Sequence, residues 1–191
     1  MEIKKFWDNG VSYQDYLSNA AERLEHPQTD EDKDYEEYYK LGIQRMNRMN
    51  EKFHPNEQQL ERLAQKKFDG KILIISEAWC GDASQVVPVV SNFFGTEKVK
   101  ISYRDQDPSL IDDFLTNGSK SIPVVIILDK DFNYINHWGP RPKHGKELLE
   151  MHKADPEGFS KEDFYVKLQT YYAKNRGLDT IEELLELIPN Q

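Results

Sequence analysis

Cysteine is almost absent from this chain of 191 residues, which contains only Cys80. A single cysteine excludes a disulfide framework within the chain and a cysteine-rich metal site. The sequence also lacks any apolar stretch of about 18 residues, the length that a membrane-spanning helix needs. No apolar run of signal-peptide length follows the first lysines, so we expect a soluble, cytoplasmic protein.

Basic residues are in the minority, with 25 lysines and arginines against 34 acidic residues and a net charge of -9. The acidic residues are spread along the chain and are not gathered in blocks. Such a chain is repelled by nucleic acids and by anionic membrane surfaces, so we expect neither as a partner. The length fits one domain, residues 1–191, with a sizeable core.

Strand patterns are missing from the first 70 residues, which we expect to be helical. Apolar residues recur at helical spacing in residues 12–25 and 34–53, and a third helix is expected from residue 56 onward. Proline follows each of the first two runs. The C-terminal part is predicted to be helical again, with candidate helices over residues 147–152, 161–173 and 180–188.

The middle of the chain has a different period. Continuous apolar runs over residues 71–76, 99–103 and 124–128 are typical of buried strands. Helical patterns over residues 82–94 and 108–115 separate them, and this alternation predicts an α/β layered fold. A fourth strand, residues 134–138, follows so closely that it must form an antiparallel hairpin with the third.

The cysteine stands at the end of the first strand, where the sequence Trp79-Cys80-Gly81-Asp82-Ala83 opens a helix. Backbone N–H groups at a helix N-terminus stabilise a thiolate, so Cys80 is a candidate nucleophile. The alternative is a small buried side chain without reactivity. Asp82 acts against reactivity because a nearby carboxylate raises the thiol pKa, although an acid also favours the first turn of a helix.

Residues 70–154 resemble the thioredoxin superfamily, and four features in the right order carry the likeness. They are the strand ending in Trp79-Cys80-Gly81, Pro88 within the following helix, Ser121-Ile122-Pro123-Val124 before the hairpin, and Trp138-Gly139 at its end. The resemblance implies a mixed sheet flanked by helices and a cis Ile122–Pro123 bond. It also implies a groove lined by Cys80, Pro123 and Gly139.

The chain departs from the family pattern at two positions. Ala83 stands where thioredoxins have their second cysteine, and Ile74 stands where they have a buried acid. We therefore expect a thioredoxin-like core over residues 70–154, of bacterial type, with a helical extension over residues 1–69 and a helical tail over residues 155–191. Without a second thiol, an external thiol would have to resolve any mixed disulfide formed by Cys80.

Arg141 belongs to the one basic cluster, residues 139–146. If Gly139 lies at the groove, Arg141 is expected to lower the pKa of Cys80 or to hold an acidic group of a ligand. The alternative is a solvated cluster at the start of a helix. The expected groove is lined, around the catalytic candidate Cys80, by Trp79, Gly81, Asp82, Ala83, Ile122, Pro123, Gly139 and Arg141.

Two functions are consistent with these residues. The first is a monothiol thiol-disulfide oxidoreductase that acts on a protein disulfide or a low-molecular-weight thiol, with no metal or cofactor. The second is a non-redox module that binds an extended peptide or a protein, with Cys80 structural. An iron-sulfur carrier is disfavoured because the motif lacks the CGFS signature of monothiol glutaredoxins. The pKa of the single thiol distinguishes the first two.

Overall fold

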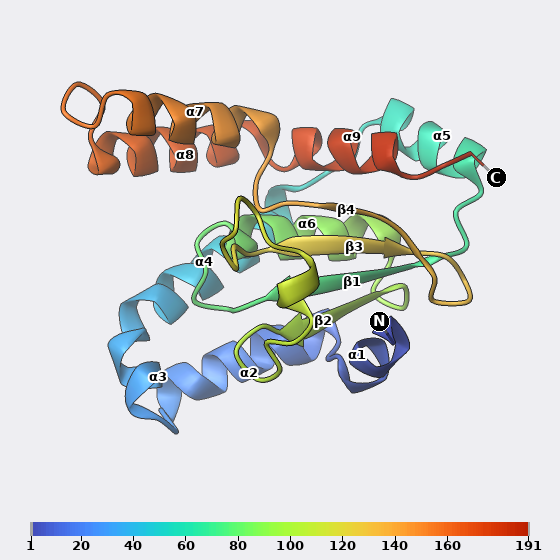
Figure 1. Cartoon of the computed structure of the whole chain (residues 1–191), viewed down its shortest axis with the longest axis horizontal. Coiled ribbons are helices and arrows are strands. Elements are labelled where there is room, and N and C mark those ends of the chain that lie inside the picture. The colour runs from blue at the N-terminus through green and yellow to red at the C-terminus, as the bar shows by residue number, and fades with distance from the viewer. Residues whose placement is uncertain (1, 191) are drawn as a thin grey trace.

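The computed structural model describes residues 2–190 and contains one four-stranded sheet (Figure 1). The strands are β1 (Lys71–Ser76), β2 (Val99–Tyr103), β3 (Val124–Leu128) and β4 (Tyr134–Trp138), in the spatial order β2-β1-β3-β4. β1 and β2 are parallel, whereas β3 is antiparallel to both β1 and β4. The mixed sheet, the α/β class and the β3–β4 hairpin confirm the expectations from sequence.

Alternate residues of β1 face opposite sides of the sheet and enter two separate layers of core. Ile72 and Ile74 pack with α2 (Tyr13–Glu25), α4 (Glu36–Lys52) and the other helices of one face. Leu73 and Ile75 pack under a second layer, which contains α1 (Ile3–Asn9) and the loop before β3. Because both faces are covered, every residue of the strand after Lys71 is buried, as its continuous apolar pattern predicts.

The helix that follows Cys80 lies between the sheet and the helices around it. α6 (Ala83–Phe94) has buried residues at every position except one and carries Pro88 inside it, as the resemblance implied. It contacts α4 and α9 (Leu178–Leu187) as well as the sheet. The start of α6, and with it the Cys80 loop, is therefore held by elements from both ends of the chain.

Helices occupy the chain before β1, as expected, and a short one precedes α4. The remaining helices of this part are α1 (Ile3–Asn9), α3 (Asp30–Asp34) and α5 (Glu57–Lys66). The helix expected over residues 108–115 is wrong, because only Ile111–Asp113 form a single 3-10 turn. The apolar side chains of that segment instead enter the second core layer from an irregular loop.

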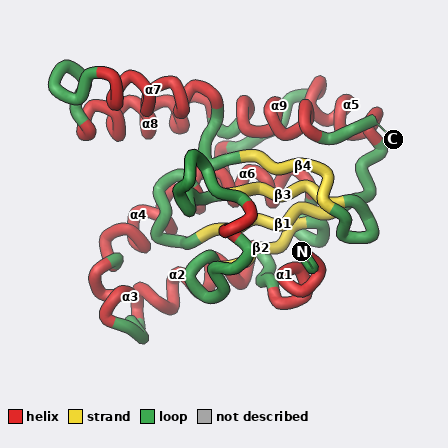
Figure 2. Tube along the Cα trace, viewed as in Figure 1, coloured by secondary structure: helices red, strands yellow, loops and turns green. Residues whose placement is uncertain are grey.

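Two C-terminal helices form an antiparallel pair that projects beyond the sheet (Figure 2). They are α7 (Lys143–Ala154) and α8 (Lys161–Asn175), which share a small core that includes Leu148 and Leu168. Gly177 then turns the chain into α9 with a φ of +84°, and a Cβ at this position would lie 2.5 Å from the side chain of Val89. None of the helices within residues 2–190 is long and apolar enough to cross a membrane.

Candidate functional site

Cys80 lies in the tight turn between β1 and α6. Its backbone N–H donates a hydrogen bond to the carbonyl oxygen of Glu77 at 3.0 Å, and its side chain is partly buried. The apolar strand ends before this turn and α6 begins three residues after Cys80, so the thiol stands at the N-terminal end of the helix. This is the placement that the sequence predicted.

The loop before β3 approaches Cys80 as expected. The Ile122–Pro123 peptide bond is cis, and the thiol of Cys80 donates a hydrogen bond to the carbonyl oxygen of Ile122 at 3.5 Å. Gly139 packs against the same loop, because a Cβ built on it would lie 2.2 Å from the carbonyl oxygen of Pro123. A second cis bond, Gly139–Pro140, was not predicted.

Arg141 lies beside the site, but its guanidinium is bound to Asp82. Nη2 and Nε of Arg141 donate hydrogen bonds to one carboxylate oxygen of Asp82 at 2.6 and 3.1 Å. The hydroxyl of Tyr172, from α8, donates to the other oxygen at 2.7 Å. Asp82 and Tyr172 are buried. The prediction of a solvated cluster is therefore wrong for Arg141, whose charge is largely balanced by Asp82.

The environment raises the pKa of the Cys80 thiol to about 12. Burial is the largest cause, because it disfavours the charged thiolate, and the negative charge of Asp82 adds to it. The backbone N–H groups of Ala83 and Asp82 and the guanidinium of Arg141 act in the opposite direction. The helix N-terminus thus favours the thiolate, as the sequence indicated, but burial outweighs it.

Six of the residues predicted for the groove line one cavity of about 650 Å³, and three do not. Ala83 is fully buried because, as the first residue of α6, it turns into the core. Pro123 and Gly139 pack against each other and are not among the lining residues. The lining residues are Tyr35, Tyr38, Leu41, Arg45, Trp79, Cys80, Gly81, Asp82, Ser121, Ile122, Arg141, Lys161, Tyr165, Leu168 and Gln169.

Helices outside the predicted core supply most of the walls of this cavity. Side chains of α4 line one part of it, and side chains of α8 line another. Trp79 forms part of the surface between them and stacks on Tyr35 with ring centroids 4.7 Å apart. The helical spacing of the tyrosines before residue 40 predicted packing, and it gave no sign that Tyr35 and Tyr38 also reach the site.

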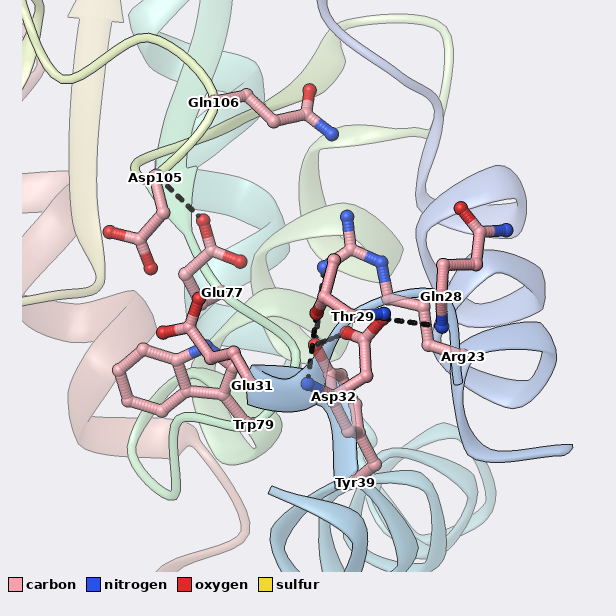
Figure 3. A pocket seen from close by; sticks show the side chains of 10 residues that line it. All are labelled: Arg23, Gln28, Thr29, Glu31, Asp32, Tyr39, Glu77, Trp79, Asp105 and Gln106. Carbon is pink, nitrogen blue, oxygen red and sulfur yellow. Dashed lines mark hydrogen bonds between the residues drawn. The ribbon is translucent and has the colours of Figure 1, made fainter. Parts of the chain in front are cut away.

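A buried carboxyl close to the site was missed from sequence. Glu77 is 2% exposed, and one of its oxygens accepts a hydrogen bond from the backbone N–H of Asp105 at 2.9 Å. Burial raises the pKa of Glu77 to about 7. Glu77 lines a second, smaller cavity of about 190 Å³ (Figure 3). Trp79 lines both this cavity and the larger one. An acid directly after a continuously apolar strand is the sequence signal that could have revealed it.

Within residues 2–190, no group of three or more histidine, cysteine, aspartate or glutamate side chains is arranged to hold a metal ion. The larger cavity presents one thiol, several aromatic rings, the carboxylate of Asp82, and hydrogen-bond donors from arginine, lysine and glutamine side chains.

Comparison with known proteins decides the family. A sequence-family model described as thioredoxin matches residues 28–155, which is more than half of the chain. This chain belongs to the thioredoxin family. In this thioredoxin-family protein, the region that the family model matches begins well before β1 and includes α3, α4 and α5.

Two solved structures resemble this thioredoxin-family protein over nearly their whole length. An HIV epitope-scaffold has a TM-score of 0.64 at 15% identity, with 98% of each chain covered. A protein of unknown function from Pseudomonas aeruginosa has a TM-score of 0.61 at 15% identity, with 96% of this chain and 94% of that chain covered. At this identity the likeness shows the fold alone. No curated protein matches the sequence.

Proposed function

We propose that this protein is a non-redox binding module that holds an extended peptide segment of another protein over Cys80. The observation that carries the proposal is the raised pKa of the only cysteine, which keeps the group a thiol at neutral pH. A thiol is a weak nucleophile compared with a thiolate, and the chain has no second thiol to resolve a mixed disulfide. The cavity around Cys80 is then used for binding.

The cavity has the size and surface of a binding site. Ligand sites commonly enclose roughly 300–1,000 Å³ and combine apolar walls with a few polar groups, and this cavity of about 650 Å³ falls in that range. Tyr38, Leu41 and Tyr165 remain between 43% and 57% exposed around it. Exposed apolar side chains gathered at one place favour contact with a partner.

The loop before β3 offers backbone for pairing with an extended segment. The backbone N–H of Ile122 has no hydrogen-bond acceptor among residues 2–190. An extended peptide that runs past this loop would supply a carbonyl oxygen to it, as in recognition by strand addition. The aromatic side chains on either side would then contact alternate side chains of the peptide.

A second function, monothiol thiol-disulfide exchange, is supported by one observation. Cys80 is partly exposed in the cavity, and two backbone N–H groups favour its thiolate. In this reaction the Cys80 thiolate attacks one sulfur of a disulfide, the S–S bond breaks, and the other sulfur leaves as a thiolate. An external thiol then releases Cys80. The substrate would be a protein disulfide or a low-molecular-weight disulfide in the reducing cytoplasm, where we propose that this protein works.

Incubation with oxidised glutathione at about pH 7 separates the two functions. For a binding module, we expect mixed disulfide to form more slowly on Cys80 than on a free cysteine derivative, as followed by intact mass. A peptide selected from a display library should shift the amide resonances of Gly81 and Ile122 equally in the wild type and in Cys80→Ser. Rapid mixed-disulfide formation, together with loss of peptide binding in Cys80→Ser, would instead establish exchange chemistry.

A further inference from the structure

Two hydrogen-bond donors from helices outside the sheet meet at the backbone beside Cys80. A Cβ built on Gly81 would lie 3.4 Å from Nη1 of Arg45 and 4.0 Å from Nε2 of Gln169. Arg45 belongs to α4 and Gln169 to α8, so the two groups approach Gly81 from different walls of the cavity. Each is partly buried.

The amide of Gln169 is fixed so that its donor remains available. Its oxygen accepts a hydrogen bond from Nε2 of Gln85 at 2.9 Å, and the oxygen of Gln85 accepts one from Nη2 of Arg48 at 3.1 Å. This chain of contacts fixes which end of the Gln169 amide is the oxygen. Its NH2 group finds no acceptor among residues 2–190 and lies toward Gly81.

Two positive charges of the cavity, those of Arg45 and Lys161, have no ion-pair partner among residues 2–190. Arg45 makes no hydrogen bond or ion pair with any residue in the described part of the chain. Burial and the charge of Arg48 lower its pKa, and the charge of Asp82 acts in the opposite direction without reversing the shift. Lys161, which also lines the cavity, makes no ion pair within residues 2–190. The only carboxylate that lines the cavity, Asp82, is bound to Arg141.

We infer that Arg45, Gln169 and Lys161 form a binding site for a carboxylate group of the ligand, next to Cys80. A partly buried guanidinium without a partner is costly, and a carboxylate that reaches it gains charge-assisted hydrogen bonds. The guanidinium fork matches the two carboxylate oxygens, and the amide of Gln169 adds a further donor. This inference rests on the proposed binding function and specifies the chemistry of the ligand.

The carboxylate has two sources with the same chemistry, an acidic side chain of a bound peptide or a small carboxylate such as a glutathione derivative. In either case selectivity comes from α4 and α8, which lie outside the strands and the cysteine motif. Arg141 was the residue expected from sequence to hold an acidic group. Its pairing with Asp82 leaves that role to Arg45.

Alkylation of Cys80 by two reagents tests this site without knowledge of the natural ligand. Iodoacetate carries a carboxylate and iodoacetamide does not, and both react with the same thiolate. The ratio of their rates is therefore independent of the pKa of Cys80, and it reports on the charge near the sulfur. We expect this ratio to exceed that of a free cysteine derivative by about fivefold, because a cation within a few ångströms attracts the carboxylate reagent.

Arg45→Met should bring the ratio most of the way to the value of the free derivative, and Lys161→Gln should lower it by less because Lys161 is exposed. Arg62→Met is the matched control, since Arg62 pairs with Glu182 elsewhere and should leave the ratio unchanged. A wild-type ratio equal to that of the free derivative, or one that Arg45→Met does not change, overturns the carboxylate site. The proposed binding function has a separate test, the pH dependence of the alkylation rate of Cys80. A midpoint below that of a free cysteine derivative overturns that function.

Protection of Cys80 from iodoacetamide identifies the source of the carboxylate. S-methylglutathione, which cannot form a disulfide, represents the small ligand, and a blocked pentapeptide with one central glutamate represents the peptide. Saturable protection by either probe, weakened in Arg45→Met, supports the site and names the source. Equal protection by the glutamate peptide and its glutamine counterpart contradicts it.

Discussion

The partly buried guanidinium of Arg141 and the buried carboxylate of Asp82 form an ion pair, joined by two hydrogen bonds to a single carboxylate oxygen. The pair connects the segment before α7 to the turn before α6, and Tyr172 of α8 completes it. It therefore fixes one wall of the cavity and at the same time places a negative charge beside Cys80.

Removing one partner of this pair should be costly. Arg141→Met leaves the buried carboxylate of Asp82 without its cation, and we expect the free energy of unfolding to fall by about 3 kcal/mol. The pKa of Cys80 should rise further because the guanidinium lowers it. Urea denaturation measures the first effect and the pH dependence of alkylation the second.

The double variant Asp82→Asn with Arg141→Met provides the control. It removes both charges, so it should recover part of the lost stability. A loss in Arg141→Met of less than about 1 kcal/mol, typical of an exposed ion pair, would contradict the buried arrangement.

Glu77 should make stability depend on pH. Its pKa is raised from 4.5 in the unfolded chain to about 7 in the folded protein, so the folded state retains a proton that the unfolded chain has lost between these values. Stability is therefore fully present below about pH 4.5 and falls as the pH rises through 7, by up to about 3 kcal/mol for this group.

Glu77→Gln cannot lose a proton and keeps an oxygen for the N–H of Asp105, so the fall between about pH 5 and 8 should become smaller. Thermal or urea denaturation across that range measures the difference. Glu31→Gln, an exposed acid at the same small cavity, is the matched control and should change little. Equal pH dependence in the wild type and Glu77→Gln would show that Glu77 is not buried in this way.

Sequence reasoning located the cysteine turn and the β3–β4 hairpin, because both depend on local chemistry, and the resemblance to thioredoxins added the cis bond. A proline before a hairpin and an apolar run before a Trp-Cys-Gly motif carry their structure within a few residues. The cavity walls depend on contacts with segments that lie far from the motif in sequence, such as that of Tyr172 with Asp82 at a separation of 90 residues. Periodicity predicts a helix such as α8 but not the side chain that it places at the site.

The direction of the pKa shift of the Cys80 thiol could not be predicted from sequence for a similar reason. The sequence shows a helix N-terminus and Asp82, whose opposite effects on the thiol pKa are both present in the structure. The burial that decides between them comes from the surrounding fold. The partner of Arg141 was equally hidden, since a basic cluster in sequence does not show which carboxylate it meets.

Ala83→Cys should create a dithiol that the natural chain lacks. The backbone N–H of Ala83 donates a hydrogen bond to the sulfur of Cys80. A side chain at position 83 therefore begins close to that sulfur. We expect an internal disulfide on oxidation, seen as the loss of two thiols and of two mass units. Reduction of insulin by this variant should remain slow because the pKa of Cys80 is raised and Ile74 supplies no carboxyl.

Ser84→Cys serves as the comparison for that variant, because a thiol at position 84 does not complete the Cys-x-x-Cys spacing, and the Ser84 side chain lies against the carbonyl oxygen of Gly81. An Ala83→Cys protein that retains two free thiols under oxidising conditions would show that the turn does not have the described geometry.

The pH dependence of alkylation of Cys80 shows whether this residue is a protonated thiol at neutral pH, on which the proposed binding function rests. The protein has one thiol, so iodoacetamide incorporation measures the thiolate fraction of Cys80 alone. The account predicts a midpoint well above the reference value of about 8.5, toward the value of about 12 set by burial and Asp82. Asp82→Asn should move the midpoint down. A wild-type midpoint below that of a free cysteine derivative would contradict the binding-module account and identify Cys80 as a nucleophile.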